Sequence, residues 1–213
     1  MKIGILGSGI VGQTLAQGLA NSGHDVRIAT GSSDRYDELQ DKVGEAVSVG
    51  SFETVAIWCE LAVLCVKGEA AEKIVSKLTS ALNDKTIIDT TNPIDESVET
   101  QDGVLAYFTS SGESLMERLQ ALATQSHFVK AFNSVGSSVM VQPKFSSQPS
   151  MFICGNDERA KKQATTIIEE LGWGVVDLGS ARAAEPIEAL CQLWCISGFR
   201  NNDWHHALRY LSN

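Results

Sequence analysis

Three glycines near the start of the chain have the spacing of a phosphate-binding turn. Gly7, Gly9 and Gly12 form a G-x-G-x-x-G pattern directly after a short predicted strand at residues 2–6, and apolar side chains then recur at helical spacing. The first glycine permits a tight turn, the second lets a pyrophosphate approach the backbone, and the third lets the helix pack close to the strand. The free N–H groups at the start of that helix would face the phosphates. The pattern therefore predicts a dinucleotide-binding turn made by Gly7, Ser8, Gly9, Ile10, Val11 and Gly12.

The loop after a second predicted strand, at residues 26–29, would choose the cofactor. Users of NAD usually carry an acidic residue at this strand tip for the ribose 2′-hydroxyl, but Thr30 stands here. The hydroxyl groups and the guanidinium that follow favour the 2′-phosphate of NADP. Asp34 keeps NAD as the alternative, because its carboxylate could bind a ribose rather than cap the helix that begins there. The predicted adenosine ligands are Thr30, Gly31, Ser32, Ser33 and Arg35.

Two more predicted strands lead into candidate residues for the nicotinamide side. The continuous apolar run at residues 61–66 is typical of a central parallel strand, and residues 86–89 form the next strand. Open α/β sheets bind ligands where such strands end. Lys67 could contact a phosphate or the substrate, or be a solvated loop lysine. Asn92, held extended before Pro93, could meet the carboxamide of nicotinamide or form an ordinary Asx turn. The predicted residues here are Cys65, Val66, Lys67, Thr90, Asn92, Pro93 and Asn133.

No group of side chains predicts a catalytic residue or a metal site. Lys130 and Asn133 lie at the carboxyl end of a strand predicted at residues 127–132 and could polarise a substrate. Lys130 could equally be a sheet-edge lysine. Cys191 and Cys195 lie on one helix face, but a second close pair with zinc spacing is missing. Direct hydride transfer between two cofactors needs positioning more than a protein acid or base. We therefore assign no catalytic residue and no metal.

Length and composition favour a globular protein with a sizeable core. The chain has 213 residues, of which 43% are hydrophobic and 20% charged, and its formal net charge is −9. An acidic surface argues against nucleic acid or an anionic membrane as a partner. We find no apolar run near the roughly 20 residues that a membrane span needs. The five cysteines, odd in number and mostly in apolar stretches, indicate reduced, buried thiols in a cytoplasmic protein.

The order of the elements predicts an α/β fold, a Rossmann-type doubly wound and mostly parallel sheet. The loop at residues 142–150 is the best boundary, so we expect a dinucleotide-binding domain over residues 1–145 and a small α/β extension over residues 146–213 packed on it. An apolar helix with Leu190, Leu193 and Trp194 should be buried on the sheet or in a dimer interface, which favours a homo-oligomer. The extension would contain strands at 151–154 and 174–178, a helix at 157–171, and a helix from 181 onward.

Seven short segments, spread over most of the chain, occur in an order that is typical of one protein family. They are residues 7–12, 61–66, 87–93, 129–133, 152–157, 176–179 and 184–186. In this order they resemble the coenzyme F420-dependent NADP oxidoreductase family. The family often has Ser/Thr-Arg at the tip of the second strand. Thr30 matches that pattern, whereas Gly31 replaces the arginine and Lys67 stands where a proline is common.

The resemblance implies a Rossmann domain with a small C-terminal segment. It also implies hydride exchange between NADP(H) and a second small-molecule cofactor, either a deazaflavin such as coenzyme F420 or a flavin, and often an oligomer. The alternative from another class is a nucleotide-binding regulatory or redox-sensing protein without turnover. Reduction of a deazaflavin, flavin or dye by NADPH would separate the two.

Overall fold

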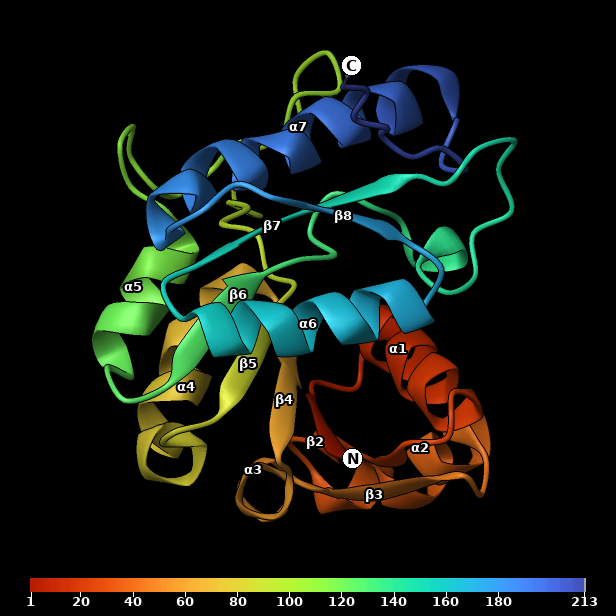
Figure 1. The fold of residues 1–213 in the computed structure, drawn as a ribbon, viewed down its shortest axis with the longest axis vertical. Coiled ribbons are helices and arrows are strands. Elements are labelled where there is room, and N and C mark those ends of the chain that lie inside the picture. The colour runs from red at the N-terminus through yellow and green to blue at the C-terminus, as the bar shows by residue number, and fades with distance from the viewer. Residues whose placement is uncertain (213) are drawn as a thin grey trace.

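The computed structural model describes residues 1–212 and contains one eight-stranded sheet with helices on both faces (Figure 1). The strand order is β3-β2-β1-β4-β5-β6-β7-β8, and only the β6–β7 pair is antiparallel. The first six strands have the order of a Rossmann fold, so the predicted fold class is confirmed. The strands are β1 (Lys2–Leu6), β2 (Asp25–Thr30), β3 (Val47–Ser51), β4 (Leu61–Leu64), β5 (Thr86–Asp89), β6 (His127–Lys130), β7 (Ser150–Gly155) and β8 (Gly174–Asp177).

The helices divide between the two faces of the sheet, because each crossover between parallel strands carries one. α1, α2 and α6 cover one face, and α3, α4, α5 and the start of α7 cover the other. The helices are α1 (Ile10–Asn21), α2 (Tyr36–Val43), α3 (Phe52–Trp58), α4 (Gly68–Leu82), α5 (Leu115–Leu122), α6 (Glu158–Glu170) and α7 (Ala184–Asn201), with short 3-10 helices η1 (Ser33–Arg35), η2 (Ser137–Val139) and η3 (Ala181–Ala183).

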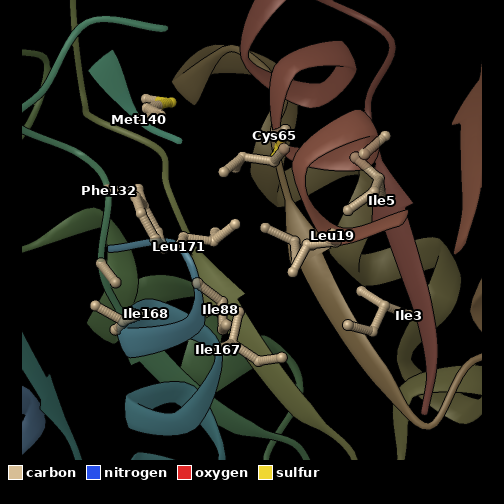
Figure 2. Packing of buried hydrophobic residues seen from close by; sticks show 14 of the residues in the cluster. Ile3, Ile5, Leu19, Cys65, Ile88, Phe132, Met140, Ile167, Ile168 and Leu171 are labelled. Carbon is tan, nitrogen blue, oxygen red and sulfur yellow. The ribbon is translucent and has the colours of Figure 1, made fainter. Parts of the chain in front are cut away.

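The central strands are apolar on both sides because helices cover both of their faces. In β1, Ile3 and Ile5 point into the core under α1 and α6, whereas Leu6 points into the core under α3 and α4. Figure 2 shows the first of these cores, to which Leu19 of α1 and Ile167 of α6 also belong. The period of two along each strand explains why continuous apolar runs in the sequence identify strands buried on both faces.

The C-terminal part extends the same sheet. β7 and β8 pair in parallel, with α6 on one face and the first turns of α7 on the other. The predicted division between residues 145 and 146 stays a prediction. The helix predicted from residue 181 onward begins as η3, continues as α7 and ends at Asn201. Residues 202–212 are not helical, because Asn202 takes a left-handed φ of 52°, and residue 213 lies outside the described residues.

The burial of α7 agrees only in part with the expectation for its apolar residues. Trp194 is buried against residues near the C-terminus and stacks on His206, while Leu193 is 56% exposed. All five cysteines are free and buried, as predicted. Among residues 1–212, no helix is both long and apolar enough to cross a membrane.

Candidate functional site

The three glycines of the first turn play different parts. Gly7 has a φ of 131°, and a Cβ atom there would lie 2.3 Å from the carbonyl oxygen of Cys65. A Cβ atom on Gly12 would lie 2.1 Å from the carbonyl oxygen of Gly7. By contrast, a Cβ atom on Gly9 would meet no atom within 4 Å. Packing of the protein therefore requires the first and third glycines, whereas the second borders open space at the start of α1.

That open space belongs to a cavity of about 270 Å³ at the carboxyl edge of the sheet. The register of the strands explains its position. Leu6 of β1 pairs with Leu64 of β4, and Leu64 pairs with Asp89 of β5, so the loops that follow these strands meet at one edge. Eight of the predicted residues line this cavity: Gly9, Ile10, Val11, Cys65, Val66, Lys67, Thr90 and Asn92.

The lining of this cavity is apolar at its base and charged at its rim. Burial raises the pKa of the Cys65 thiol to about 12, against a hydrogen bond with Thr90 that lowers it, so this sulfur stays a neutral thiol. At the rim, Lys67 Nζ lies 2.6 Å from Glu96 Oε2, and both side chains are exposed. The hydrogen bond with Glu96 raises the pKa of Lys67. Solvent screens such a pair, so it can separate when an anion approaches the rim.

Asn92 and Asn133 contact each other. Asn92 Nδ2 donates a hydrogen bond to the Asn133 carbonyl oxygen at 2.7 Å, and Asn133 Nδ2 donates to Asn92 Oδ1 at 3.0 Å. Asn133 and Pro93 are buried and do not line the cavity. The structure thus brings Asn92 to the cavity and places Asn133 behind it. The role of these residues as cofactor ligands stays a prediction.

A second cavity, of about 620 Å³, lies beside the end of β2. Thr30 pairs with Ser51 at the end of β3, so the residues after both strands reach the same edge. Thr30 and Gly31 line this cavity, whereas Ser32, Ser33 and Arg35 do not; as adenosine ligands, all five stay predictions. The expectation that Asp34 caps a helix is wrong, because Ser32 is the N-cap of η1 and Arg35 that of α2.

The second cavity also contains residues that the sequence analysis did not select. Phe52 lies at the start of α3, and Lys73 and Lys77 lie one turn apart on α4. The four-residue spacing of the lysines was a usable signal, since it places both on one face of a helix. The tertiary position of α4 beside the tip of β2 was the missing information. Both lysines offer positive charge in addition to Arg35, the cation that the sequence predicted for the adenosine end.

Lys130 is not a sheet-edge lysine, because its side chain is completely buried. Its Nζ lies 2.7 Å from Asp89 Oδ2 and 2.8 Å from Glu188 Oε1. It also donates a hydrogen bond to the Thr91 carbonyl oxygen at 2.8 Å. Burial alone would lower the pKa of Lys130, but the two carboxylates raise it on balance. The lysine is therefore held as a cation behind the wall of the first cavity and cannot reach a substrate there.

The cysteines of α7 contact each other rather than a histidine. Cys191 Sγ and Cys195 Sγ are 3.9 Å apart, and His206 stacks on Trp194 instead. Within residues 1–212, no three or more His, Cys, Asp or Glu side chains are grouped as metal ligands would be.

Comparison with known proteins finds a family model and a curated relative with the same described activity. The family model described as "NADP oxidoreductase coenzyme F420-dependent" matches residues 2–93. The F420-dependent NADP reductase of Methanocaldococcus jannaschii is 26% identical over 204 residues, which cover 91% of this chain and 90% of that protein. Metalloreductase STEAP3 of Rattus norvegicus is 26% identical over 190 residues, which cover 89% of this chain but 36% of that protein. The chain thus spans only about a third of that longer relative.

A solved structure shares the whole fold. It is a protein from Arthrobacter sp. FB24, described as a proposed F420-dependent NADP-reductase, with a TM-score of 0.92, 28% identity and full coverage of both chains. A hypothetical protein from Sinorhizobium meliloti, at 24% identity and a TM-score of 0.72 over 87% of each chain, shares the fold. The resemblance of this chain to the coenzyme F420-dependent NADP oxidoreductase family is therefore confirmed.

Proposed function

We propose that this protein is an oxidoreductase that binds NADP(H) along the carboxyl edge of its sheet and exchanges hydride with a second organic cofactor. Gly9 is the observation that carries the proposal. It borders open space at the start of α1, although the glycines on either side of it are tightly packed. A pyrophosphate fits such a place, because the first N–H groups of a helix lack partners within the helix and attract anions.

The two cavities suit the two ends of the dinucleotide. The first, between the ends of β1, β4 and β5, would hold the nicotinamide end, with Val66 and Ile10 as apolar surfaces and Thr90 as a polar one. The second would hold the adenosine end, where Phe52 can contact the base and Lys73 and Lys77 can attract a 2′-phosphate. Similarity to an F420-dependent NADP reductase along most of both chains supports NADP as the dinucleotide.

The chemistry would come from the cofactors, since NADP(H) supplies the hydride when it is bound. This chain's own residues would bind and orient the two cofactors and would exclude water from them. Cys65 keeps its proton well above neutral pH, so it would not react as a nucleophile. Lys67 lies at the exposed rim in contact with Glu96, where it would bind an anionic group of a carrier rather than transfer a proton. Direct hydride transfer requires only that the two rings be correctly placed.

The test is to mix the purified protein with NADPH under anaerobic conditions, in one reaction together with coenzyme F420 and in another together with FMN. We expect NADPH to be oxidised in step with reduction of F420, and NADH to be used less well. Oxidation with FMN alone would identify a flavin-linked enzyme. Binding of NADPH without oxidation in the presence of any carrier would contradict the proposal and favour a regulatory or redox-sensing protein. A cytoplasmic location and a homo-oligomer stay predictions.

A further inference from the structure

The wall of the first cavity formed by residues 90–92 has little regular structure of its own. β5 ends at Asp89, and the next helix begins only at Leu115. Thr90, Thr91 and Asn92 nevertheless line the cavity. A loop that must present atoms to a ligand needs support from outside itself, because its backbone lacks a helix or sheet ladder to fix it.

The first support is the buried cluster around Lys130. Asp89 Oδ1 accepts hydrogen bonds from the Thr91 amide at 2.9 Å and the Thr91 hydroxyl at 2.7 Å. Lys130 bridges the other oxygen of Asp89, the Thr91 carbonyl oxygen and Glu188. Glu188 lies on α7 and also accepts the amides of Leu115 and Met116. One lysine therefore connects the cavity wall to the C-terminal helix and to the start of α5.

The second support is Asn133, which lies three residues after Lys130. Its Nδ2 donates to Asn92 Oδ1 and, at 2.8 Å, to the carbonyl oxygen of Ile187 on α7. Between Lys130 and Asn133, Phe132 adopts a φ of 57°, a left-handed conformation that is rare and unfavourable for a bulky side chain. Such a conformation persists only where its surroundings enforce it, which here directs Asn133 toward the cavity wall.

We infer that Lys130 and Asn133 are positioning residues that fix the nicotinamide-side wall, residues 90–92, against α7. This inference rests on the proposed function. A buried lysine between two carboxylates is costly to desolvate and contributes little net stability compared with apolar residues of similar volume. Its value here is geometric, because both supports link the same loop to adjacent residues of α7, Ile187 and Glu188. The C-terminal helix thereby forms part of the cofactor site without contacting the cofactor.

The experiment compares two ligands that differ only at the nicotinamide end. NADP⁺ and 2′-phospho-ADP-ribose are titrated calorimetrically into the wild type and into Lys130→Met. We expect the variant to bind NADP⁺ about tenfold more weakly and the fragment with less than about a twofold change, because only the nicotinamide wall moves. Lys161→Met is the matched control, since Lys161 is also buried and paired with an aspartate, Asp177, but lies on α6; it should change neither affinity.

Asn133→Ala is the second variant, because it removes a support without leaving two carboxylates unbalanced in the interior. It should show the same ligand dependence with about a threefold loss for NADP⁺. This variant decides the question if Lys130→Met does not fold. Equal weakening of both ligands, or no weakening of either, would overturn the inference. If the wild type binds neither ligand, the proposed function itself fails, and the inference fails with it.

Discussion

The two walls of the first cavity are built in opposite ways. The wall at the glycine turn is made from consecutive residues, and its shape comes from backbone and from missing side chains, as at Gly7 and Gly12. The opposite wall, at residues 90–92, depends on side chains from β5, β6 and α7 that meet only in the folded protein. The first wall is therefore a local motif, whereas the second is a tertiary assembly.

This difference predicts different sensitivities to mutation. A substitution at Gly7 or Gly12 should disturb the turn directly, because a new Cβ atom there collides with backbone that cannot move aside. A substitution behind the second wall should act at a distance, through the position of residues that the mutated side chain holds.

Gly12→Ala should destabilise the protein most. The new Cβ atom would lie 2.1 Å from the carbonyl oxygen of Gly7, so either the turn or the start of α1 must shift. We expect a loss of more than about 3 kcal/mol in the free energy of unfolding. Gly9→Ala is the control, because its Cβ atom meets nothing within 4 Å and should cost less than about 1 kcal/mol. Chemical denaturation measures both, and equal losses would contradict the division of roles among the glycines.

Replacement of Lys73 and Lys77 together should have an effect of intermediate size. It should change only the preference of the protein for NADP⁺ over NAD⁺. Both lysines line the second cavity, where a 2′-phosphate would gain charge-assisted hydrogen bonds. The double alanine variant should bind NADP⁺ about tenfold more weakly and NAD⁺ almost unchanged. Arg35→Ala should cause a smaller loss, because Arg35 does not line this cavity. A larger loss of NADP⁺ affinity from Arg35→Ala would show that the loop after β2 determines the cofactor preference.

The smallest effect concerns alkaline pH and the cluster around Lys130. The folded-state pKa of this lysine is raised above its ordinary value of 10.5. The stabilisation from its charged form is therefore complete below pH 10.5 and is lost as the pH rises through the higher folded-state pKa. Melting temperatures measured from pH 9 upward should fall more steeply for the wild type than for Lys130→Met. Parallel curves would show that the charge of Lys130 does not titrate with unfolding.

Much of the fold could be predicted from local patterns. The apolar run at residues 61–66 identified β4, since strands buried on both faces lack polar alternation, and residues 86–89 were predicted as the strand that is β5. The glycine spacing identified the turn and α1 because that motif is contiguous in sequence. The end of α7 was not predicted. It ends at Asn201 because Asn202 is left-handed, and Trp204 folds back onto Gly198, where a Cβ atom would collide with its ring.

The residues that depend on tertiary contacts could not be assigned in the same way. Lys130 looked equally suited to a sheet edge or to a substrate, because nothing near it in sequence shows that Asp89 and Glu188 enclose it. Asn92 was expected to meet the carboxamide of nicotinamide or to form an Asx turn. It lines the first cavity, and nothing near it in sequence shows that its side-chain amide donates a hydrogen bond to the Asn133 carbonyl oxygen. Lys73 and Lys77 were missed because the cavity beside them forms between α4 and the end of β2.

Titration of NADPH into the wild type and into Gly9→Val tests directly whether the dinucleotide lies on the glycine turn. The valine side chain would enter open space, so the variant should unfold at nearly the same temperature as the wild type. It should nevertheless bind NADPH more than about a hundredfold more weakly, because the side chain occupies the place of the pyrophosphate. Unchanged affinity in the folded variant would show that the dinucleotide does not lie on this turn.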